Sequence, residues 1–257
     1  MLANENVLTT EGFGVTVTLP NGETKVLLRD VSISLKSGRA IAIVGESGSG
    51  KTTLAKAIAG LLPTTMAVDG ALSTVGLVGY MFQDAGNALN PTRRAVWQVE
   101  EALRALGMPR ARRRAAALEY LQRAEVPDVD RYSRRYPHQL SGGLAQRVLL
   151  AAVLAANPSI LIADEPTSAL DVTTQARIAT LLRRLVKEEN LGMILITHDL
   201  TVAAQICDDI AVMHEGELVE QGDTRKILES PQHEYTRKLV GALPHRGLPA
   251  RMEEKAD

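Results

Sequence analysis

Residues 45–52, GESGSGKT, place glycines, a lysine and a threonine in the spacing of a phosphate-binding loop. An apolar run, AIAIV at 40–44, comes before the loop, and a helical pattern, KTTLAKAIAGLL, begins within it. Backbone N–H groups of such a loop surround phosphate oxygens at the positive end of a helix. The alternative is a glycine-rich turn without a ligand, which the strand–loop–helix context disfavours. The residues expected to bind phosphates are Gly45, Glu46, Ser47, Gly48, Ser49, Gly50, Lys51, Thr52 and Thr53.

Polar residues end three other apolar runs. Asp164 and Glu165 follow SILIA, Gln83 follows YMF, and His198 follows LIT. Carboxyl ends of parallel strands meet at one sheet edge, where ligands bind. Asp164, Gln83 and the Thr52 hydroxyl suit a magnesium ion, and Glu165 suits an attacking water. Gln83 could also contact that water, and His198 could contact a terminal phosphate and hold the water in line. Taken singly, each residue is more often a polar strand end or a structural histidine, so the assignment depends on the loop nearby.

The segment LSGGLAQR, residues 140–147, is a second helix start suited to phosphate. Ser141, Gly142 and Gly143 offer a hydroxyl and N–H groups at the start of a helical pattern. The alternative is a serine that caps the helix, followed by glycines. A chain that closes one phosphate site by itself does not need a second.

The elements that must position these residues alternate between strands and helices. The runs 15–19 and 24–28 flank Asn-Gly and predict a hairpin, and 31–35 alternates like a half-exposed strand. Buried-type strands at 40–44, 159–164 and 192–197, with a helix at 171–188, predict a parallel sheet. The stretch from about 90 to 157 is helical, and two strands near 209–221, two short helices and a polar tail follow.

Composition is that of a globular protein without a strong electrostatic preference. The chain has 257 residues, 45% hydrophobic and 23% charged, with a net charge of −1. Its one cysteine, Cys207, allows no internal disulfide or cysteine metal cluster and is expected to be a small buried side chain. The start lacks a signal-peptide pattern, and the apolar tract 149–163 is broken by Asn157-Pro158. We expect a cytoplasmic protein, with the arginine-rich 109–114 as a solvated helix face instead of a nucleic-acid site.

Five motifs in this order, GESGSGKT, FQD, LSGGLAQR, ILIADEPTSALD and LITHD, resemble the ATPase subunit of ATP-binding cassette (ABC) transporters. The resemblance covers roughly residues 8 to 244. Within the family, NALNP, YPHQLSGG, ADEPTSALDVTTQARI and SPQHEYTRKLVGALP are similar to the oligopeptide, dipeptide and nickel importer ATPases.

The resemblance implies an α/β P-loop NTPase core with a mostly parallel sheet, a β-rich N-terminal subdomain and an inserted helical subdomain at about 90–157. Residues 1–244 would be one ABC ATPase domain and 245–257 a polar tail. It implies ATP and Mg²⁺ as cofactors. Two cassettes would dimerise head to tail, so that Ser141, Gly142 and Gly143 of one face the phosphate loop of the other. Asp171 would lie at the dimer seam.

The same resemblance implies the partners. These are two transmembrane permease subunits, a second related ATPase or a second copy of this chain, and indirectly an external solute-binding protein. This chain itself would be peripheral, at the cytoplasmic face of the cell membrane. Peptide, nickel and a metal–chelator complex remain open as the solute. A soluble ABC ATPase acting on nucleic acid or ribosomes would carry two cassettes or a coiled-coil insertion, and a regulatory cassette would lack Glu165 or Lys51. The sequence favours neither, and we expect no nucleic-acid partner.

The sequence departs from the family pattern in three places. The stretch between Lys51 and Gln83 is short, so a surface hairpin is expected to be trimmed. Leu144 and Ala145 stand where polar residues are common. The position of the usual adenine-stacking aromatic aligns with Val17, and Phe13 is the nearest aromatic.

Overall fold

The computed structural model describes residues 5–168 and 170–243, so the predicted tail lies outside the described residues. Its main sheet has the strand order β10-β9-β4-β8-β7-β6. Strand pairing is parallel except between β9 and β10, which confirms the mostly parallel sheet. The strands are β4 (Ala40–Val44), β6 (Val78–Met81), β7 (Ile160–Asp164), β8 (Gly192–Thr197), β9 (Asp209–His214) and β10 (Glu217–Asp223).

The central strands are buried on both faces, as their unbroken apolar runs predict. All residues of β4, β7 and β8 are buried. Alternate side chains of β4 enter two separate cores: Ala42 and Val44 pack in one, and Ile41 and Ile43 in the other. Because side chains alternate along a strand, each core covers one face of the sheet.

A second, antiparallel sheet contains β1 (Asn6–Thr18), β2 (Thr24–Val31), β3 (Ser34–Lys36) and β5 (Met66–Thr74). The predicted hairpin is confirmed, because Thr18 pairs with Thr24. The predicted strand at 31–35 is wrong in its bounds. Val31 ends β2 and β3 begins at Ser34, because the Thr10 hydroxyl donates to Val31 O and accepts from Ile33 N between them. The sequence did not predict β5, whose mostly exposed side chains give no apolar alternation.

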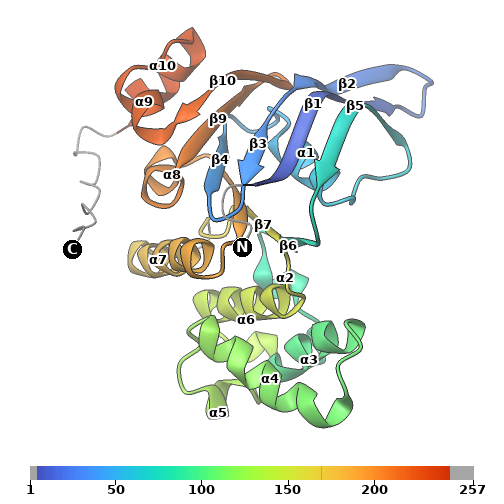
Figure 1. Cartoon of the computed structure of the whole chain (residues 1–257), viewed down its shortest axis with the longest axis vertical. Helices are drawn as coiled ribbons and strands as arrows, with labels where there is room; N and C mark the ends of the chain where they lie inside the picture. The colour runs from blue at the N-terminus through green and yellow to red at the C-terminus, as the bar shows by residue number, and fades with distance from the viewer. Residues whose placement is uncertain (1–4, 169, 244–257) are drawn as a thin grey trace.

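The helices divide between the sheet and a separate lobe (Figure 1). Those near the sheet are α1 (Lys51–Ile58), α7 (Val172–Glu188), α8 (Leu200–Ile206), α9 (Thr224–Glu229) and α10 (Glu234–Gly241). The lobe contains α2 (Ala85–Ala88), α3 (Ala95–Ala105), α4 (Arg110–Arg123), α5 (Val129–Tyr132), a 3₁₀ turn at Pro137–Gln139 and α6 (Gly142–Ala155). In the described part of the chain, no helix is long and apolar enough to cross a membrane.

Candidate functional site

The phosphate loop leaves the end of β4 and turns directly into α1. Gly50 precedes α1 in the left-handed region, at φ 99°, and a Cβ there would lie 2.6 Å from Leu28 Cδ2. A Cβ on Gly45, at φ 153°, would lie 2.1 Å from the carbonyl oxygen of Met213. Backbone conformation therefore favours glycine at both positions, and at Gly45 the clash with a backbone oxygen requires it by space as well. The packing that fixes the loop comes from β2 and β9.

Lys51, the first residue of α1, folds back along the loop. Its ammonium group donates to Gly45 O at 2.8 Å and to Glu46 O at 2.6 Å. The residue is 7% exposed, and burial lowers the pKa of the ammonium, which the nearby carboxylates of Glu165 and Asp164 oppose. Lys51 thus supplies a positive charge held at the loop carbonyls, within the cavity described next.

A cavity of about 630 Å³ opens over the loop. It brings together residues from the phosphate loop, the start of α1 and the ends of β6, β7 and β8. Its lining residues are Leu27, Ser47, Gly48, Gly50, Lys51, Thr52, Thr53, Gln83, Asp164, Glu165 and His198. Four segments that lie far apart in the sequence therefore meet at one sheet edge, as the strand-end argument predicts.

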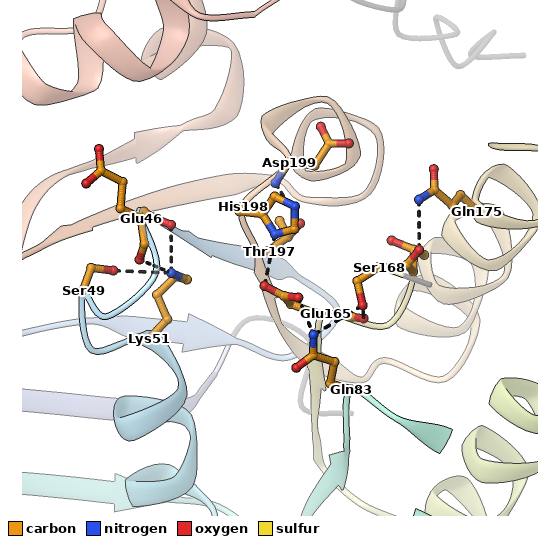
Figure 2. A network of polar contacts seen from close by, with 12 residues as sticks. Glu46, Ser49, Lys51, Gln83, Glu165, Ser168, Gln175, Thr197, His198 and Asp199 are labelled. Atoms are coloured by element: carbon orange, nitrogen blue, oxygen red, sulfur yellow. Dashed lines mark hydrogen bonds and ion pairs between the residues drawn. The ribbon is translucent and has the colours of Figure 1, made fainter. Parts of the chain in front are cut away.

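Glu165 is the centre of a polar network at this edge (Figure 2). The Gln83 side chain donates from Nε2 to Glu165 Oε2 at 2.7 Å, and His198 Nδ1 lies 3.1 Å from Glu165 Oε1. The Glu165 backbone has φ 44°, which is uncommon for a residue with a side chain, and its N–H donates to Ile196 O at 2.9 Å. Such conformations persist where the surroundings impose them, often at functional sites. The carboxylate thus faces the cavity with both oxygens oriented.

Asp164 is held by a residue that the sequence analysis did not single out. The Tyr80 hydroxyl donates to Asp164 Oδ2 at 2.7 Å, and Asp164 is 7% exposed. Tyr80 pairs with Ile162, two residues before Asp164 on the same face of β7, so the ring reaches along the strand. Burial raises the pKa of the Asp164 carboxyl, and the bond from Tyr80 opposes that shift.

The residues of the cavity fit a magnesium ion that arrives with a nucleotide. Thr52 and Asp164 both line the cavity and offer a hydroxyl and a carboxylate, and Gln83 adds an amide. Magnesium keeps several waters and binds through one or two protein oxygens plus phosphates, so it needs no dense acidic cluster. Consistent with this, the described residues contain no group of three or more His, Cys, Asp or Glu placed to hold a metal.

The second helix start does not join this cavity. Ser141 precedes α6 as its N-cap residue, yet its side chain makes no capping hydrogen bond. Ser141 and Gly142 are exposed, and neither they nor Gly143 line the cavity. A Cβ on Gly143 would lie 2.6 Å from Thr174 Cγ2, because α6 approaches the start of α7 closely. The Ser141 side chain therefore does not cap α6, which was the alternative explanation for a serine at this position.

Asp171 has a local role that the sequence analysis did not assign. It is the N-cap of α7, and its carboxylate accepts from the Thr174 N–H at 3.0 Å and the Thr174 hydroxyl at 2.8 Å. These bonds, first the one from the hydroxyl, lower the pKa of the Asp171 carboxyl. Asp171 does not line the cavity. A place at a dimer seam stays a prediction beside this capping role.

Neither Val17, which aligns with the usual adenine-stacking position, nor Phe13, the nearest aromatic, lines the cavity. Phe13 is 2% exposed and packs in the core under the antiparallel sheet, so it is not available to stack on a base. Val17 lies on β1 and does not line the cavity. Leu27 of β2 does, and it is the large apolar side chain there. No sequence motif identifies Leu27, because its position depends on β2 passing over the loop. In this part of β2, the Arg29 N–H donates to Gly216 O.

Sequence comparison shows similarity to one family along most of the chain. Residues 28–168 match the model of the ABC transporter family. The chain is 37% identical over 262 residues to the oligopeptide transport ATP-binding protein OppD of Lactococcus lactis subsp. cremoris (strain SK11), covering 95% of this chain and 77% of that protein. It is 40% identical over 264 residues to the dipeptide transport ATP-binding protein DppD of Bacillus subtilis (strain 168), covering 95% and 78%.

Solved structures give the same result. A dimeric ATP-binding cassette in a post-hydrolysis state with ADP and Pi matches with a TM-score of 0.71 and 32% identity, over 85% of this chain and 99% of that one. A second dimeric structure, of a bacterial ABC transporter cassette, matches with a TM-score of 0.72 and 31% identity over the same shares.

Proposed function

The chain belongs to the ABC transporter family, and on that premise we propose that it is the ATP-hydrolysing subunit of a membrane importer for peptides. The observation that carries the proposal is the cavity. There the phosphate loop meets two carboxylates at the end of β7: that of Asp164, which accepts from the Tyr80 hydroxyl, and that of Glu165, which accepts from Gln83. The relatives named above are oligopeptide and dipeptide transport proteins, which favours peptide over nickel or a metal–chelator complex as the solute.

In this proposal, the loop N–H groups and Lys51 hold the phosphates of ATP, with the adenine lying toward Leu27. Thr52, Asp164 and Gln83 would hold magnesium, which when bound offsets phosphate charge. Glu165 orients the attacking water and accepts its proton. His198 contacts the terminal phosphate and, through its 3.1 Å contact, keeps Glu165 in place. The chemistry is thus mostly positioning and electrostatics.

The site would be completed by a second cassette. Ser141, Gly142 and Gly143 start a helix whose N-terminal groups are exposed and lie outside the chain's own cavity. We propose that they bind the terminal phosphate of ATP held by a partner, which is a second ATPase subunit or a second copy. Gln146 of the same helix donates to the Gln83 backbone oxygen at 3.3 Å, which supports a mechanical link between the helical lobe and the cavity.

At the cytoplasmic face of the membrane, the chain would bind two transmembrane permease subunits that use the movement of the lobe, with an external solute-binding protein delivering the peptide. The interpretation of the arginine-rich run in α4 as a helix face, and not as a nucleic-acid site, is supported by two of its side chains. Arg113 donates to Met108 O, and Arg114 lies 3.8 Å from Glu100, so these side chains have partners within the lobe.

The test is to purify the tagged chain with its native partners and place the complex in liposomes with ATP inside. We expect membrane permeases to co-purify and peptide uptake to require ATP. Lys51→Ala, which removes the phosphate-binding ammonium, should abolish uptake while leaving assembly intact. Co-purification with ribosomes in place of permeases would instead support the soluble alternative.

A further inference from the structure

A single peptide unit of the phosphate loop is held from both sides. The carbonyl of Gly45 accepts from Lys51 Nζ at 2.8 Å. The N–H of the same unit, at Glu46, donates to the hydroxyl oxygen of Tyr235 at 2.9 Å. In a trans peptide these two groups point in opposite directions. Tyr235, which is 189 residues from Glu46 in the chain, therefore contacts this peptide unit on the side opposite Lys51, the lysine proposed to bind phosphate.

Tyr235 is itself fixed in place. It is 8% exposed, and its ring stacks on that of His214 at 4.0 Å with 24° between the planes. The Glu220 carboxylate of β10 accepts from the N–H groups of Gln232 and His233, at 2.8 and 3.0 Å, just before α10 begins. The start of α10 is thus tied to β9 and β10 (Figure 1). The Tyr235 hydroxyl therefore reaches the loop from a helix, α10, that is itself packed in place.

The hydroxyl is suited to this contact at neutral pH. Burial raises the pKa of the Tyr235 phenol, so the group stays neutral and keeps its proton. The Glu46 N–H, although predicted to bind phosphate, donates to Tyr235, and a backbone N–H away from water needs such a partner. Tyr235 supplies that partner and so fixes the orientation of the Gly45–Glu46 peptide. If the peptide turned, the carbonyl that now contacts Lys51 would move with it.

We propose that Tyr235 is a positioning residue of the phosphate site and that α10 is thereby coupled to nucleotide occupancy. The inference rests on the proposed ATPase function and adds a regulatory connection to it. Because coupling between two sites is reciprocal, a docked α10 strengthens nucleotide binding, and bound nucleotide strengthens the docking of α10. A protein that pulled α10 away would weaken nucleotide binding at a distance.

The first test measures ADP binding to the full chain by calorimetry. Tyr235→Phe keeps the ring on His214 and removes the hydroxyl. It should weaken ADP binding about two- to tenfold, the effect of losing one hydrogen bond. Tyr132→Phe, which removes a hydroxyl in the helical lobe, is the matched control and should bind like the wild type. Equal affinity in all three proteins would overturn the proposal.

The second test measures hydrogen exchange in residues 234–241 with and without ADP. In the wild type, ADP should slow exchange along α10, and in Tyr235→Phe this protection should shrink markedly. A merely structural role would change exchange without ADP and leave the effect of ADP intact, which would overturn the proposal. A wild type that binds ADP without protecting α10 would also overturn it, and the ATPase function would stand. A wild type that binds no ADP would refute both.

Discussion

Replacing Glu165 with glutamine separates the chemistry of this residue from its role in the network. The carboxylate accepts from Gln83 Nε2 through one oxygen and contacts His198 Nδ1 through the other. An amide has the same shape. Its oxygen can accept from Gln83 and its nitrogen can donate to Nδ1, once the histidine proton sits on the other ring nitrogen. Glu165→Gln therefore keeps both partners and removes the proton acceptor.

The size of the effect follows from that difference. A positioned general base contributes about 10²–10⁴-fold to a rate, which corresponds to about 3–5.5 kcal/mol of barrier. We expect ATP turnover to fall at least about a hundredfold. ATP affinity should stay near the wild-type value, because the loop and Lys51 are untouched. Binding without hydrolysis should make the ATP-bound closed dimer accumulate.

The assay compares steady-state turnover in the assembled complex with ATP affinity and with the dimer fraction by size-exclusion chromatography. Glu165→Ala is the useful companion, since it leaves Gln83 and His198 without their shared acceptor and should disturb binding as well. If Glu165→Gln retained full turnover in the intact complex, the assignment of Glu165 as the catalytic carboxylate would be wrong.

Four further predictions follow from the same geometry. Ser141→Arg should block hydrolysis at the partner's site while this chain's own loop still binds ATP, and the monomeric chain should be a weak ATPase; a monomer as fast as the complex would exclude a shared site. Phe13→Ala should lower stability by about 3–5 kcal/mol, as for other buried aromatics, without a specific loss of nucleotide affinity. GTP should be used within about tenfold of ATP, because no Phe, Tyr or Trp is among the described residues that line the cavity, and competition titrations check this. Tyr80→Phe should lower the free energy of unfolding by about 1.5–3 kcal/mol at neutral pH; the hydroxyl stabilises ionised Asp164, so this deficit should shrink as pH falls through the raised pKa of that carboxyl, as urea unfolding at two pH values would reveal.

The sequence predicted those parts of the fold and site that depend on local pattern. Unbroken apolar runs identified β4, β7 and β8, and residues at their ends meet in the cavity because parallel strands finish at one edge. The glycines in GESGSGKT identified the phosphate loop, because residues with a side chain rarely adopt the backbone conformation of such a loop. These signals are carried by neighbouring residues, so a single sequence contains them.

What the sequence did not predict depends on contacts between distant segments. Tyr80 reaches Asp164 through the pairing of β6 with β7, and Leu27 enters the cavity because β2 passes over the loop. β5 is held by its pairing with β1 and has mostly exposed side chains, so no apolar period marks it. Phe13 had the right chemistry for stacking, but tertiary packing placed it in the core.

The charge of the cavity is an argument for the proposal that a second cassette completes the site. Among the described residues that line it, Lys51 is the one lysine or arginine, whereas Asp164 and Glu165 are both acidic. A bound nucleoside triphosphate would add several negative charges to this excess of acidic over basic side chains. The loop N–H groups and the dipole of α1 offset part of it, and a magnesium ion would offset more. Under the proposed function, further donors on the outer side of the terminal phosphate would offset the remaining charge. Ser141, Gly142 and Gly143 are donors of that kind at a helix start, and they lie outside the cavity of their own chain. A partner cassette that supplied the same three residues would balance the site, and hydrolysis would then depend on two cassettes closing together.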